Sequence, residues 1–245
     1  MKVAVLCGGR GTRMGKDLKG LPKALMPIGK KPIIWHIMKF YAQFGFNDFL
    51  LCLGYKGQDI ERYFRHCREF RITFVDTGLE TNTGGRIKRI EPYIDTDVFM
   101  ATYGDGLSNV NLKALLRAHA AHGKMATLTA VRPRSTFGIV GIDSHTGMIS
   151  HFDEKPLLDH WINGGFFVFQ KKVFGHVRRG DILEKDTFGR LVGMKEIGAY
   201  KHAGFWECMD TYKDNIHLNE LWASKRPPWA LWKHAGGKIK KERYG

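Results

Sequence analysis

Two carboxylates in this chain stand where they could hold a divalent cation. Asp105 lies in TYGDG, directly after the apolar run Val98–Thr102, and Asp210 lies in GFWECMDT. Aspartate oxygens are hard ligands of the kind that Mg²⁺ takes, and α/β sheets bind ligands at the carboxyl ends of their strands. Asp105 could equally serve an ordinary Asp-Gly turn, and Asp210 could cap the helix that follows it. As a pair, they indicate a magnesium site that leaves positions for phosphate oxygens and water.

A glycine-rich loop near the amino terminus is suited to phosphate. Gly8, Gly9 and Gly11 follow the apolar run Val3–Cys7, and their missing side chains let backbone N–H groups approach phosphate oxygens closely. The same segment is basic, with Arg10, Arg13, Lys16, Lys19, Lys23, Lys30 and Lys31 against one acidic residue. Glycines after a strand often serve only a tight turn, and the spacing fits neither GxxxxGKS/T nor a GxGxxG that opens a helix. Glycines and charge together favour a triphosphate site.

Two further motifs could bind a second substrate that carries a phosphate and hydroxyls. Lys155, in EKP, could reach a phosphate as a mobile point charge. Asn163 and Gly164, in NGGFF, would let a hydroxyl approach the backbone while the amide side chain reads it. A surface lysine before proline is also unremarkable, and paired glycines inside a strand can mark only a bulge.

A loop rich in Gly and Thr joins DTG at Asp76–Gly78 to TGGR at Thr83–Arg86. Its backbone amides suit the edge of a nucleobase or a phosphate. A loop that merely caps the following helix is an equally good interpretation of the local sequence.

The elements that must position these groups alternate between strands and helices in the first half of the chain. The predicted strands are Val3–Cys7, Asp48–Leu53, Ile72–Val75 and Val98–Thr102, and the predicted helices are Pro32–Phe44, Gln58–Arg68, Gly85–Tyr93 and Leu112–Ala121. Such alternation with short connections predicts parallel βαβ units with right-handed crossovers. The carboxyl ends of the strands then meet at one edge of the sheet, together with the glycine loop and Asp105.

From Met125 the pattern changes. Strands are predicted at Met125–Val131, Ile139–Ile142, Met148–Phe152, Ile162–Phe169 and Ile197–Lys201, with a hairpin turn over Asp143–Gly147, and helices at Val173–Arg178, Leu183–Leu191 and Lys213–Ser224. The sequence contains no internal repeat and no low-complexity linker. We therefore expect a single domain over residues 1–229, followed by a basic tail over residues 230–245.

Composition excludes several classes of protein. The 43% of apolar and 26% of charged residues are ordinary for a globular domain, and no apolar run reaches the length of about eighteen residues that a membrane span needs. The net charge of +15 raises the question of nucleic acid. Outside the glycine loop and the tail, however, basic residues are spread along the chain without a nucleic-acid-binding signature. We expect no nucleic-acid and no membrane partner. The four cysteines lack disulfide or metal spacing, which predicts reduced thiols in a cytoplasmic protein.

Taken in order, the motifs resemble those of the sugar-1-phosphate nucleotidylyltransferases. GGRGTR and PKALMPIGKKPI are similar to the family signature, GGxGTR followed by PKP-M-x-x-I-x-x-KP, with Ala24 and Leu25 where the family usually has Pro and Met. The resemblance continues over about residues 1–229 through GYKG, DTG, TGGRIKR, TYGDG, HGKMATLTAV, FDEKP, INGGFFVF and GFWECMDT. WHIMK, TGGR and W-x-x-MDT are closer to the cytidylyltransferase branch than to the thymidylyl- or uridylyltransferases.

The resemblance implies an α/β fold with a Rossmann-type, GT-A-like sheet, mixed and mostly parallel, flanked by helices and carrying a small β-hairpin subregion. It implies transfer of a cytidylyl group from CTP to a sugar 1-phosphate, glucose 1-phosphate first among the candidates, with release of pyrophosphate and with Mg²⁺ as cofactor. This is an in-line displacement at the α-phosphorus, in which positioning and charge neutralisation do most of the catalysis.

The resemblance also assigns roles to residues of this sequence. Catalysis falls to Arg13 at the pyrophosphate, Lys23 at the α-phosphate, Lys155 at the sugar phosphate, and Asp105 and Asp210 at Mg²⁺. The nucleotide is expected to contact Leu6, Gly8, Gly9, Gly11, Thr12, Arg13, Lys23, Thr83, Gly84, Arg86, Tyr103, Gly104 and Asp105. The sugar phosphate is expected to contact Lys155, Asn163 and Gly164.

Other classes remain open. A thymidylyl- or uridylyltransferase is one, because the choice of base depends on a few backbone hydrogen bonds. A GT-A glycosyltransferase would share the sheet but normally carries Asp-x-Asp, where this chain has Gly-Asp-Gly. A nucleotide sensor without activity would be expected to lose Arg13, Lys23 or one carboxylate, and the sequence keeps all of them. The resemblance further implies a homo-oligomer, although the chain is short between Phe64 and Asp76, where the family usually carries a longer excursion involved in subunit contacts.

Overall fold

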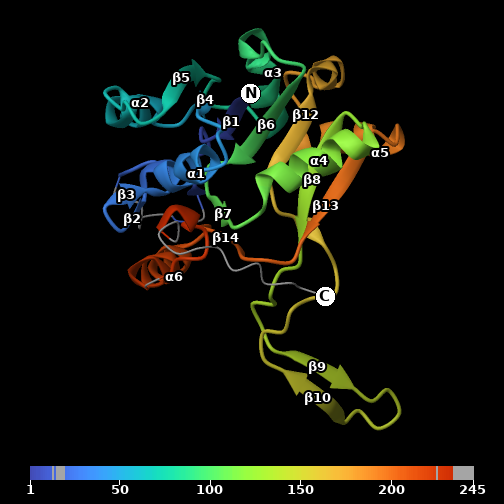
Figure 1. Ribbon diagram of the computed structural model, residues 1–245. Helices are drawn as coiled ribbons and strands as arrows, with labels where there is room; N and C mark the ends of the chain where they lie inside the picture. Colours follow the sequence, from blue (N-terminus) through green and yellow to red (C-terminus); the bar gives the residue numbers. More distant parts are fainter. Residues whose placement is uncertain (13, 15–19, 225, 234–245) are drawn as a thin grey trace.

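A central sheet with helices on both faces forms the body of the molecule (Figure 1). The computed structural model describes residues 1–12, 14, 20–224 and 226–233. Eight strands of this described part make up the sheet, and from one edge to the other they are β13 (Ile197–His202), β8 (Ala126–Val131), β11 (Ile162–Asn163) with β12 (Phe167–Gln170), β6 (Val98–Tyr103), β1 (Lys2–Leu6), β4 (Asp48–Leu53) and β5 (Arg71–Asp76).

The sheet is mixed and mostly parallel. β1 pairs in parallel with β4 and β6, β4 pairs in parallel with β5, and β13 pairs in parallel with β8. The antiparallel pairs involve β12, which lies between β6 and β8, and β11, which pairs with the end of β8. The parallel pairs predicted from the alternation of strands and helices are confirmed for β1, β4, β5 and β6, and so is the mixed, mostly parallel sheet that the resemblance implies.

Both faces of the sheet are buried, as the continuous apolar runs of its strands predict. Successive side chains of β1 point to opposite faces, so that Val3 and Val5 belong to one buried apolar cluster and Ala4 and Leu6 to another. The first cluster includes residues of α1 (Ile33–Ala42), α2 (Gly57–Phe64), α4 (Leu112–His122) and α6 (Tyr212–Ala223). The second includes residues of α3 (Thr83–Arg89), η4 (Lys171–His176) and α5 (Phe188–Gly193).

Local sequence explains where the longer helices begin and end. The Asn111 side chain accepts a hydrogen bond from the Ala114 N–H (3.0 Å) at the start of α4, and Gly123 ends this helix in the left-handed conformation (φ 64°). A reciprocal capping box between Thr211 and Asp214 starts α6. Among the described residues, none of the helices is both long enough and apolar enough to span a bilayer.

Short elements complete the chain. They are the 3₁₀ helices η2 (Lys23–Leu25), η3 (Glu91–Tyr93) and η6 (Leu231–Lys233), the π-helix η5 (Leu183–Thr187), and the two-stranded pairs β2 (Pro27–Ile28) with β3 (Lys31–Pro32) and β7 (Gly106–Ser108) with β14 (Trp206–Cys208). Among them, η5 continues directly into α5.

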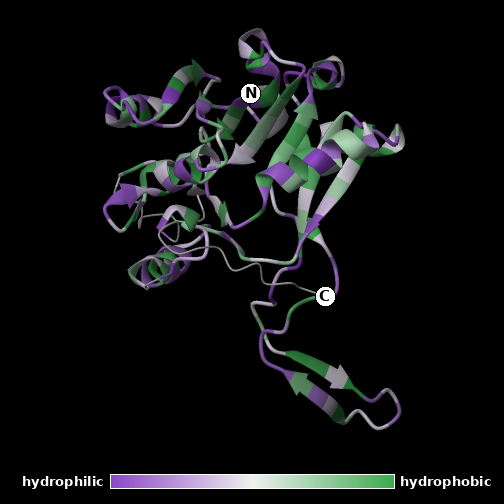
Figure 2. Ribbon diagram, in the orientation of Figure 1, coloured by the Kyte–Doolittle hydropathy of each residue, from purple (hydrophilic) through white to green (hydrophobic). Residues whose placement is uncertain are grey.

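A two-stranded hairpin, β9 (Ile139–Ile142) with β10 (Ile149–Asp153), extends away from the body (Figure 1). Its strands carry apolar side chains (Figure 2), and several are exposed, including Phe137 just before it (77%) and Phe152 within it (62%). The hairpin predicted from the turn at Asp143–Gly147 is confirmed. It buries little apolar surface of its own, and an isolated hairpin of this size is only marginally stable in water.

The structure corrects several predicted elements. The strand predicted over Ile162–Phe169 is two strands, because both Gly165 (φ 75°) and Phe166 (φ 48°) are left-handed. Gly164 and Gly165 still form backbone hydrogen bonds with Thr129 of β8. The helix predicted over Val173–Arg178 is the 3₁₀ helix η4, and that over Leu183–Leu191 begins as a π-helix. The helix predicted over Gln58–Arg68 ends at Phe64.

A buried histidine joins the carboxyl-terminal segment to the body. His36 of α1 is fully buried beside Trp222 and Trp229 (ring centroids 4.5 and 6.1 Å away). Its Nε2 lies 2.9 Å from the Ile28 carbonyl oxygen, and the Trp229 Nε1–H donates to its Nδ1 (3.4 Å). With one nitrogen donating and the other accepting, the ring is neutral. Burial lowers the pKa of His36 from 6.5 to about 4.

We expect the free energy of unfolding to fall as the pH drops below 6.5. A histidine whose pKa is depressed by folding stabilises the protein fully above its unfolded pKa of 6.5, and this stabilisation is lost as the pH falls towards the folded value of about 4. Between pH 7.5 and pH 5 the loss due to His36 is about 2 kcal/mol. Urea unfolding at both pH values should show a loss larger by this amount in the native chain and in the control His160→Gln, which changes an exposed residue, than in His36→Gln. His119, whose burial also lowers its pKa to about 4, still contributes a loss in His36→Gln. An equal loss in all three would contradict it.

Candidate active site

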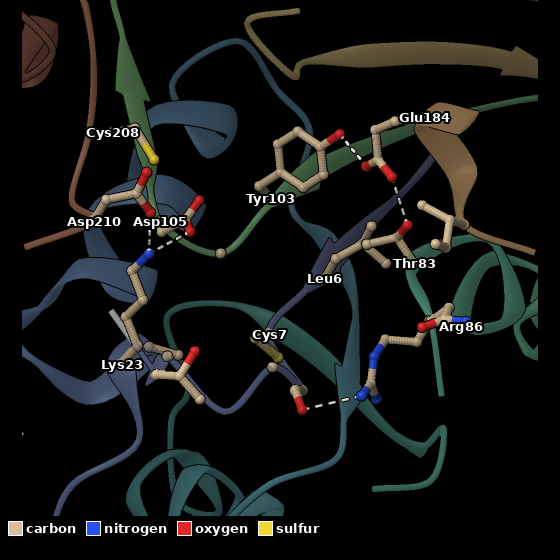
Figure 3. Close-up of a pocket in the computed structure, with 18 of the residues that line it drawn as sticks. Leu6, Cys7, Lys23, Thr83, Arg86, Tyr103, Asp105, Glu184, Cys208 and Asp210 are labelled. Atoms are coloured by element: carbon tan, nitrogen blue, oxygen red, sulfur yellow. Dashed lines mark hydrogen bonds and ion pairs between the residues drawn. The ribbon is translucent and has the colours of Figure 1, made fainter. Parts of the chain in front are cut away.

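A cavity of about 670 Å³ opens at the carboxyl ends of β1 and β6. The chain adds β4 and β5 on one side of β1 and then returns to β6 on the other side, so the cavity lies where the strand order reverses, the usual ligand site of an open α/β sheet. Most of the predicted site residues line it, namely Leu6, Gly8, Gly9, Gly11, Thr12, Lys23, Thr83, Arg86, Tyr103, Gly104, Asp105, Asn163 and Asp210. Figure 3 shows how several of these side chains converge.

The two predicted carboxylates lie together on one side of the cavity, bridged by Lys23. The Lys23 ammonium lies 2.7 Å from Asp105 Oδ2 and 2.7 Å from Asp210 Oδ1 (Figure 3). Backbone pairing causes this convergence: β7 and β14 are antiparallel, and the Met209 N–H donates to the Asp105 carbonyl oxygen (2.9 Å). Residues 105 and 210 are thereby held side by side.

Burial and charge act on Lys23 in opposite directions. Its side chain is 12% exposed, and burial by itself lowers the pKa of the ammonium. The charge of Asp105 and the hydrogen bonds to Asp105 and Asp210 outweigh burial, so the pKa of Lys23 is raised above its usual value. Lys23 is therefore a permanent cation that partly neutralises two carboxylates.

The donor set fits a hard divalent cation. Ligand atoms of Asp105, Cys208 and Asp210 all lie within 4.8 Å of one another. Two carboxylates suit Mg²⁺, which fills its remaining positions with water and phosphate oxygens. Burial, followed by the charges of Asp105 and Asp210, raises the pKa of the Cys208 thiol, so Cys208 stays protonated and offers Mg²⁺ only a soft, weak donor.

Arg86 fixes the glycine loop from below. Its guanidinium is 5% exposed and donates to the carbonyl oxygens of Gly8 (3.0 Å), Leu53 (3.0 Å) and Gly78 (2.9 Å) and to Thr77 Oγ1 (2.6 Å). These acceptors follow or end β1, β4 and β5, so one side chain joins the carboxyl ends of three parallel strands. Because the described contacts occupy the guanidinium with backbone oxygens, its predicted contact with nucleotide remains a prediction.

The opposite side of the cavity is a chain of polar side chains. Tyr103, at the end of β6, donates its hydroxyl hydrogen to Glu184 of η5 and accepts a hydrogen bond from Asn163 Nδ2 (2.9 Å). Thr83 Oγ1, at the start of α3, also donates to Glu184 (2.7 Å). Figure 3 shows the two bonds to Glu184.

Some predicted site residues do not line the cavity. Gly84 packs against Asp181, whose Cβ would lie 2.7 Å from an added Cβ, and the Gly164 carbonyl oxygen accepts a hydrogen bond from Trp206 Nε1 (2.7 Å). Lys155 follows the hairpin, is exposed, and forms an ion pair with Glu154 (3.3 Å). Arg13 lies outside the described residues. The roles predicted for these residues remain predictions.

Sequence reasoning missed other residues that line the cavity. They include Cys7, Ala24, Thr81, Asn82, Ile182, Glu184, Trp206 and Cys208. Trp206 and Cys208 belong to the same GFWECMDT motif as Asp210, so their position next to a predicted ligand in the sequence was the signal that could have found them. Glu184 had no comparable signal, because it was one acidic residue at the start of a predicted helix.

A bare glycine loop, a buried lysine and two paired carboxylates at the switch point of an α/β sheet define a nucleotide-binding group-transfer enzyme. A family model described as nucleotidyl transferase matches residues 2–207. The chain belongs to this family, and the enzyme class predicted from its motifs is confirmed.

Curated relatives and solved structures agree with the family. The chain is 39% identical to a probable glucose-1-phosphate cytidylyltransferase of Bacillus subtilis and 40% identical to the glucose-1-phosphate cytidylyltransferase of Salmonella typhimurium, in each case over 95% of this chain and all of the relative. A putative glucose-1-phosphate thymidylyltransferase from Bacillus anthracis shares the fold, with a TM-score of 0.72 at 20% identity over 91% of this chain and 95% of that one. The predicted Rossmann-type fold is confirmed.

Two adjacent glycines of the loop should respond differently to a methyl group. A Cβ at Gly8 would lie 2.2 Å from Arg86 Nη1 and 2.8 Å from the Gly54 nitrogen, whereas a Cβ at Gly9 has no heavy atom within 4 Å. We expect Gly8→Ala to lower the free energy of unfolding by about 2 kcal/mol or more, and Gly9→Ala to leave it nearly unchanged. Chemical denaturation of the two variants measures this difference. Equal stability would show that Arg86 does not hold Gly8 in place.

Proposed function

We propose that this chain transfers a cytidylyl group from CTP to a sugar 1-phosphate, giving a CDP-sugar and pyrophosphate. One observation carries the proposal: Lys23 bridges Asp105 and Asp210 beside a glycine loop whose backbone is open to the cavity. This arrangement offers both a cationic side chain for a phosphate and two carboxylates for the metal that accompanies a triphosphate.

Charge neutralisation explains how these residues would act on the α-phosphate. Asp105 and Asp210 would hold Mg²⁺, which supplies positive charge to the triphosphate. Lys23 is charged and lies beside them, so its ammonium would stabilise negative charge on the α-phosphate as the sugar phosphate oxygen attacks. The loop at Gly8, Gly9 and Gly11 would present N–H groups to phosphate oxygens. No covalent intermediate is needed.

The remaining contacts follow the order of groups around the cavity. Thr12 and Leu6 would contact the nucleotide beside the glycine loop, with Gly84 close by, and Thr83 would do so from α3. Arg13 would neutralise the departing pyrophosphate. Tyr103 and Gly104, at and after the end of β6, would contact the nucleotide. The Tyr103 hydroxyl accepts a hydrogen bond from Asn163, which would contact the sugar phosphate near Gly164. Arg86 would act by holding the Gly8 carbonyl.

CTP is the proposed nucleotide, and glucose 1-phosphate is the first candidate acceptor. The support is the contrast in identity, which is 39–40% with two glucose-1-phosphate cytidylyltransferases but 29% with a uridylyltransferase of Synechocystis and 29% with a mannose-1-phosphate guanyltransferase of Hypocrea jecorina. We also infer a cytoplasmic location, supported by the free thiols of Cys7, Cys52, Cys67 and Cys208.

Pyrophosphate release tests the proposal directly. The protein is incubated with Mg²⁺, one of CTP, UTP, dTTP, GTP or ATP, and one member of a panel of sugar 1-phosphates. We expect the fastest release with CTP and glucose 1-phosphate. Preference for UTP or dTTP would establish the alternative nucleotidylyltransferases, and turnover of a nucleotide sugar without pyrophosphate would establish the glycosyltransferase.

Neutralising either carboxylate should abolish most of the activity. Asp105→Asn and Asp210→Asn each remove charge from the metal site, and we expect turnover to fall on the order of a thousandfold or more. The control Asp95→Asn changes an exposed carboxylate paired with Lys2 and should retain activity. Binding of Mn²⁺, followed by electron paramagnetic resonance, should weaken in the two site variants only. Near-normal turnover and Mn²⁺ affinity in both would exclude this metal site.

Lys155→Ala should affect the acceptor rather than the nucleotide. We propose that the Lys155 ammonium binds the sugar phosphate, and its loss should raise the KM for the sugar 1-phosphate about tenfold or more while the affinity for CTP stays constant. Lys172→Ala, at another exposed lysine, is the control. An unchanged KM for the sugar 1-phosphate would refute the assignment.

We also propose that the chain forms a homo-oligomer. The support is the exposed apolar surface of the β9–β10 hairpin, which includes Ile142, Met148, Ile149 and Phe152. Sedimentation velocity at micromolar concentration measures the oligomeric state of the protein.

A further inference from the structure

Four hydrogen-bonded side chains span the cavity. Thr83 donates from Oγ1 to Glu184 Oε2 (2.7 Å), Tyr103 donates from its hydroxyl to Glu184 Oε1, and Asn163 donates from Nδ2 to the Tyr103 oxygen (2.9 Å). All four line the cavity, and they come from α3, η5, the end of β6 and β11. Figure 3 shows Glu184 joined by dashed lines to both Tyr103 and Thr83.

The hydrogen bonds among these four side chains can have only one set of donors and acceptors. An ionised carboxylate accepts hydrogen bonds and donates none, so both hydroxyl hydrogens are committed to Glu184. The Tyr103 oxygen is then free to accept from Asn163.

This set of donors and acceptors fixes the amide of Asn163. Its Nδ2 donates to Tyr103, and its Oδ1 accepts from the Gly165 N–H (3.0 Å). A flipped amide would place an oxygen against the Tyr103 oxygen and an NH₂ group against the Gly165 N–H, losing both bonds. Within the described residues, the second N–H of the amide has no protein acceptor, so it can donate to a ligand in the cavity.

Glu184 is held in place by its own segment. It lies in the π-helix η5, an irregularity that frequently occurs at functional sites. The Leu183 N–H donates to Thr83 Oγ1 (2.9 Å), and Asp186 Oδ2 accepts from the Ile182 N–H (2.7 Å). The Leu183–Thr83 bond thus joins the start of η5 to the start of α3 beside the Thr83–Glu184 bond, and the Ile182–Asp186 bond holds the start of η5 itself.

We propose that Glu184 is a positioning residue that couples the two halves of the cavity, holding Thr83 for the nucleotide and, through Tyr103, orienting Asn163 for the sugar phosphate. The inference rests on the proposed function, which assigns Thr83 and Asn163 to the two substrates. Glu184 does not react with either substrate. Its carboxylate accepts hydrogen bonds from both Thr83 and Tyr103, so the side chains that face the two substrates are positioned by one and the same residue.

A double-mutant cycle tests the coupling. Glu184→Gln keeps the shape of the side chain but replaces one accepting oxygen by an NH₂ group and removes the charge. One hydroxyl must then direct its hydrogen elsewhere, and the hydrogen bond from the other hydroxyl is weakened. Tyr103→Phe removes only the hydroxyl that links Glu184 to Asn163. Thr83→Val removes only the hydroxyl that links Glu184 to the start of α3. Lys185→Gln, an exposed neighbour in η5, is the control and should behave as the native chain.

We expect Tyr103→Phe to raise the KM for the sugar 1-phosphate about tenfold while the calorimetric Kd for CTP changes by less than about twofold. Thr83→Val should instead raise the Kd for CTP about tenfold. Glu184→Gln should affect both substrates. Combined with Tyr103→Phe, it should raise the KM for the sugar 1-phosphate no further than either single change.

The failures can be told apart. If the effects of Glu184→Gln and Tyr103→Phe on the KM multiply in the double variant, the coupling is overturned while the proposed function stays intact. The same holds if Glu184→Gln lowers only the melting temperature. A native chain that binds CTP but releases no pyrophosphate with any acceptor would overturn the proposed function, and the Kd for CTP of Thr83→Val, Glu184→Gln and their double variant would still test the nucleotide arm. A native chain that does not bind CTP would overturn both.

Discussion

The site depends on a balance of charge among Lys23, Asp105 and Asp210. Two carboxylates close together in a partly buried cavity repel each other, and the ammonium between them offsets much of that repulsion. The lysine is 82 residues from one carboxylate and 187 from the other along the chain. Only the completed sheet, with β14 paired to β7, brings the three together. The charge cluster and the fold therefore require each other.

A second cation, the buried Arg86, forms hydrogen bonds with backbone oxygens instead of an ion pair with a carboxylate among the described residues. Within the described part of the chain, its hydrogen bonds go to carbonyl oxygens and one threonine hydroxyl, so its charge is stabilised by oriented dipoles. Because Gly8 lies against the guanidinium, the glycine at this position is needed for packing, whereas Gly9 faces open space. The loop thus contains one glycine whose small size the protein interior requires and one that keeps the cavity open.

Sequence predicted the parts of the fold that follow periodic patterns. Continuous apolar runs identified β1, β4 and β6, and the rule that ligands bind at the carboxyl ends of strands brought Asp105 and the glycine loop to the correct edge. The residue types and the resemblance both paired Asp210 with Asp105, but no periodic pattern predicted the backbone pairing that brings them together, because β7 and β14 are each three residues long and too short to give an alternation signal. The left-handed Phe166 that divides β11 from β12 is an unfavourable conformation for a bulky residue, and tertiary packing sustains it. Glu184 and the burial of Arg86 were missed or left open because both depend on contacts distant in sequence.

The segment that carries the hairpin leaves the sheet at the end of β8 and returns to it at the start of β11, and these two points are paired with each other. β8 and β11 are directly paired there, with Val131 opposite Ile162, so the backbone ladder is complete whatever segment emerges between them. Length and composition of such an emergent segment can change between homologous chains at little cost to the sheet, since loops placed this way carry variation while the scaffold stays constant. Homologous chains can therefore acquire new surface properties by exchanging this one appendage while the sheet and the site that contains Lys23 and Asp105 are inherited unaltered. An exchange that includes position 155 would also replace the proposed contact to the sugar phosphate.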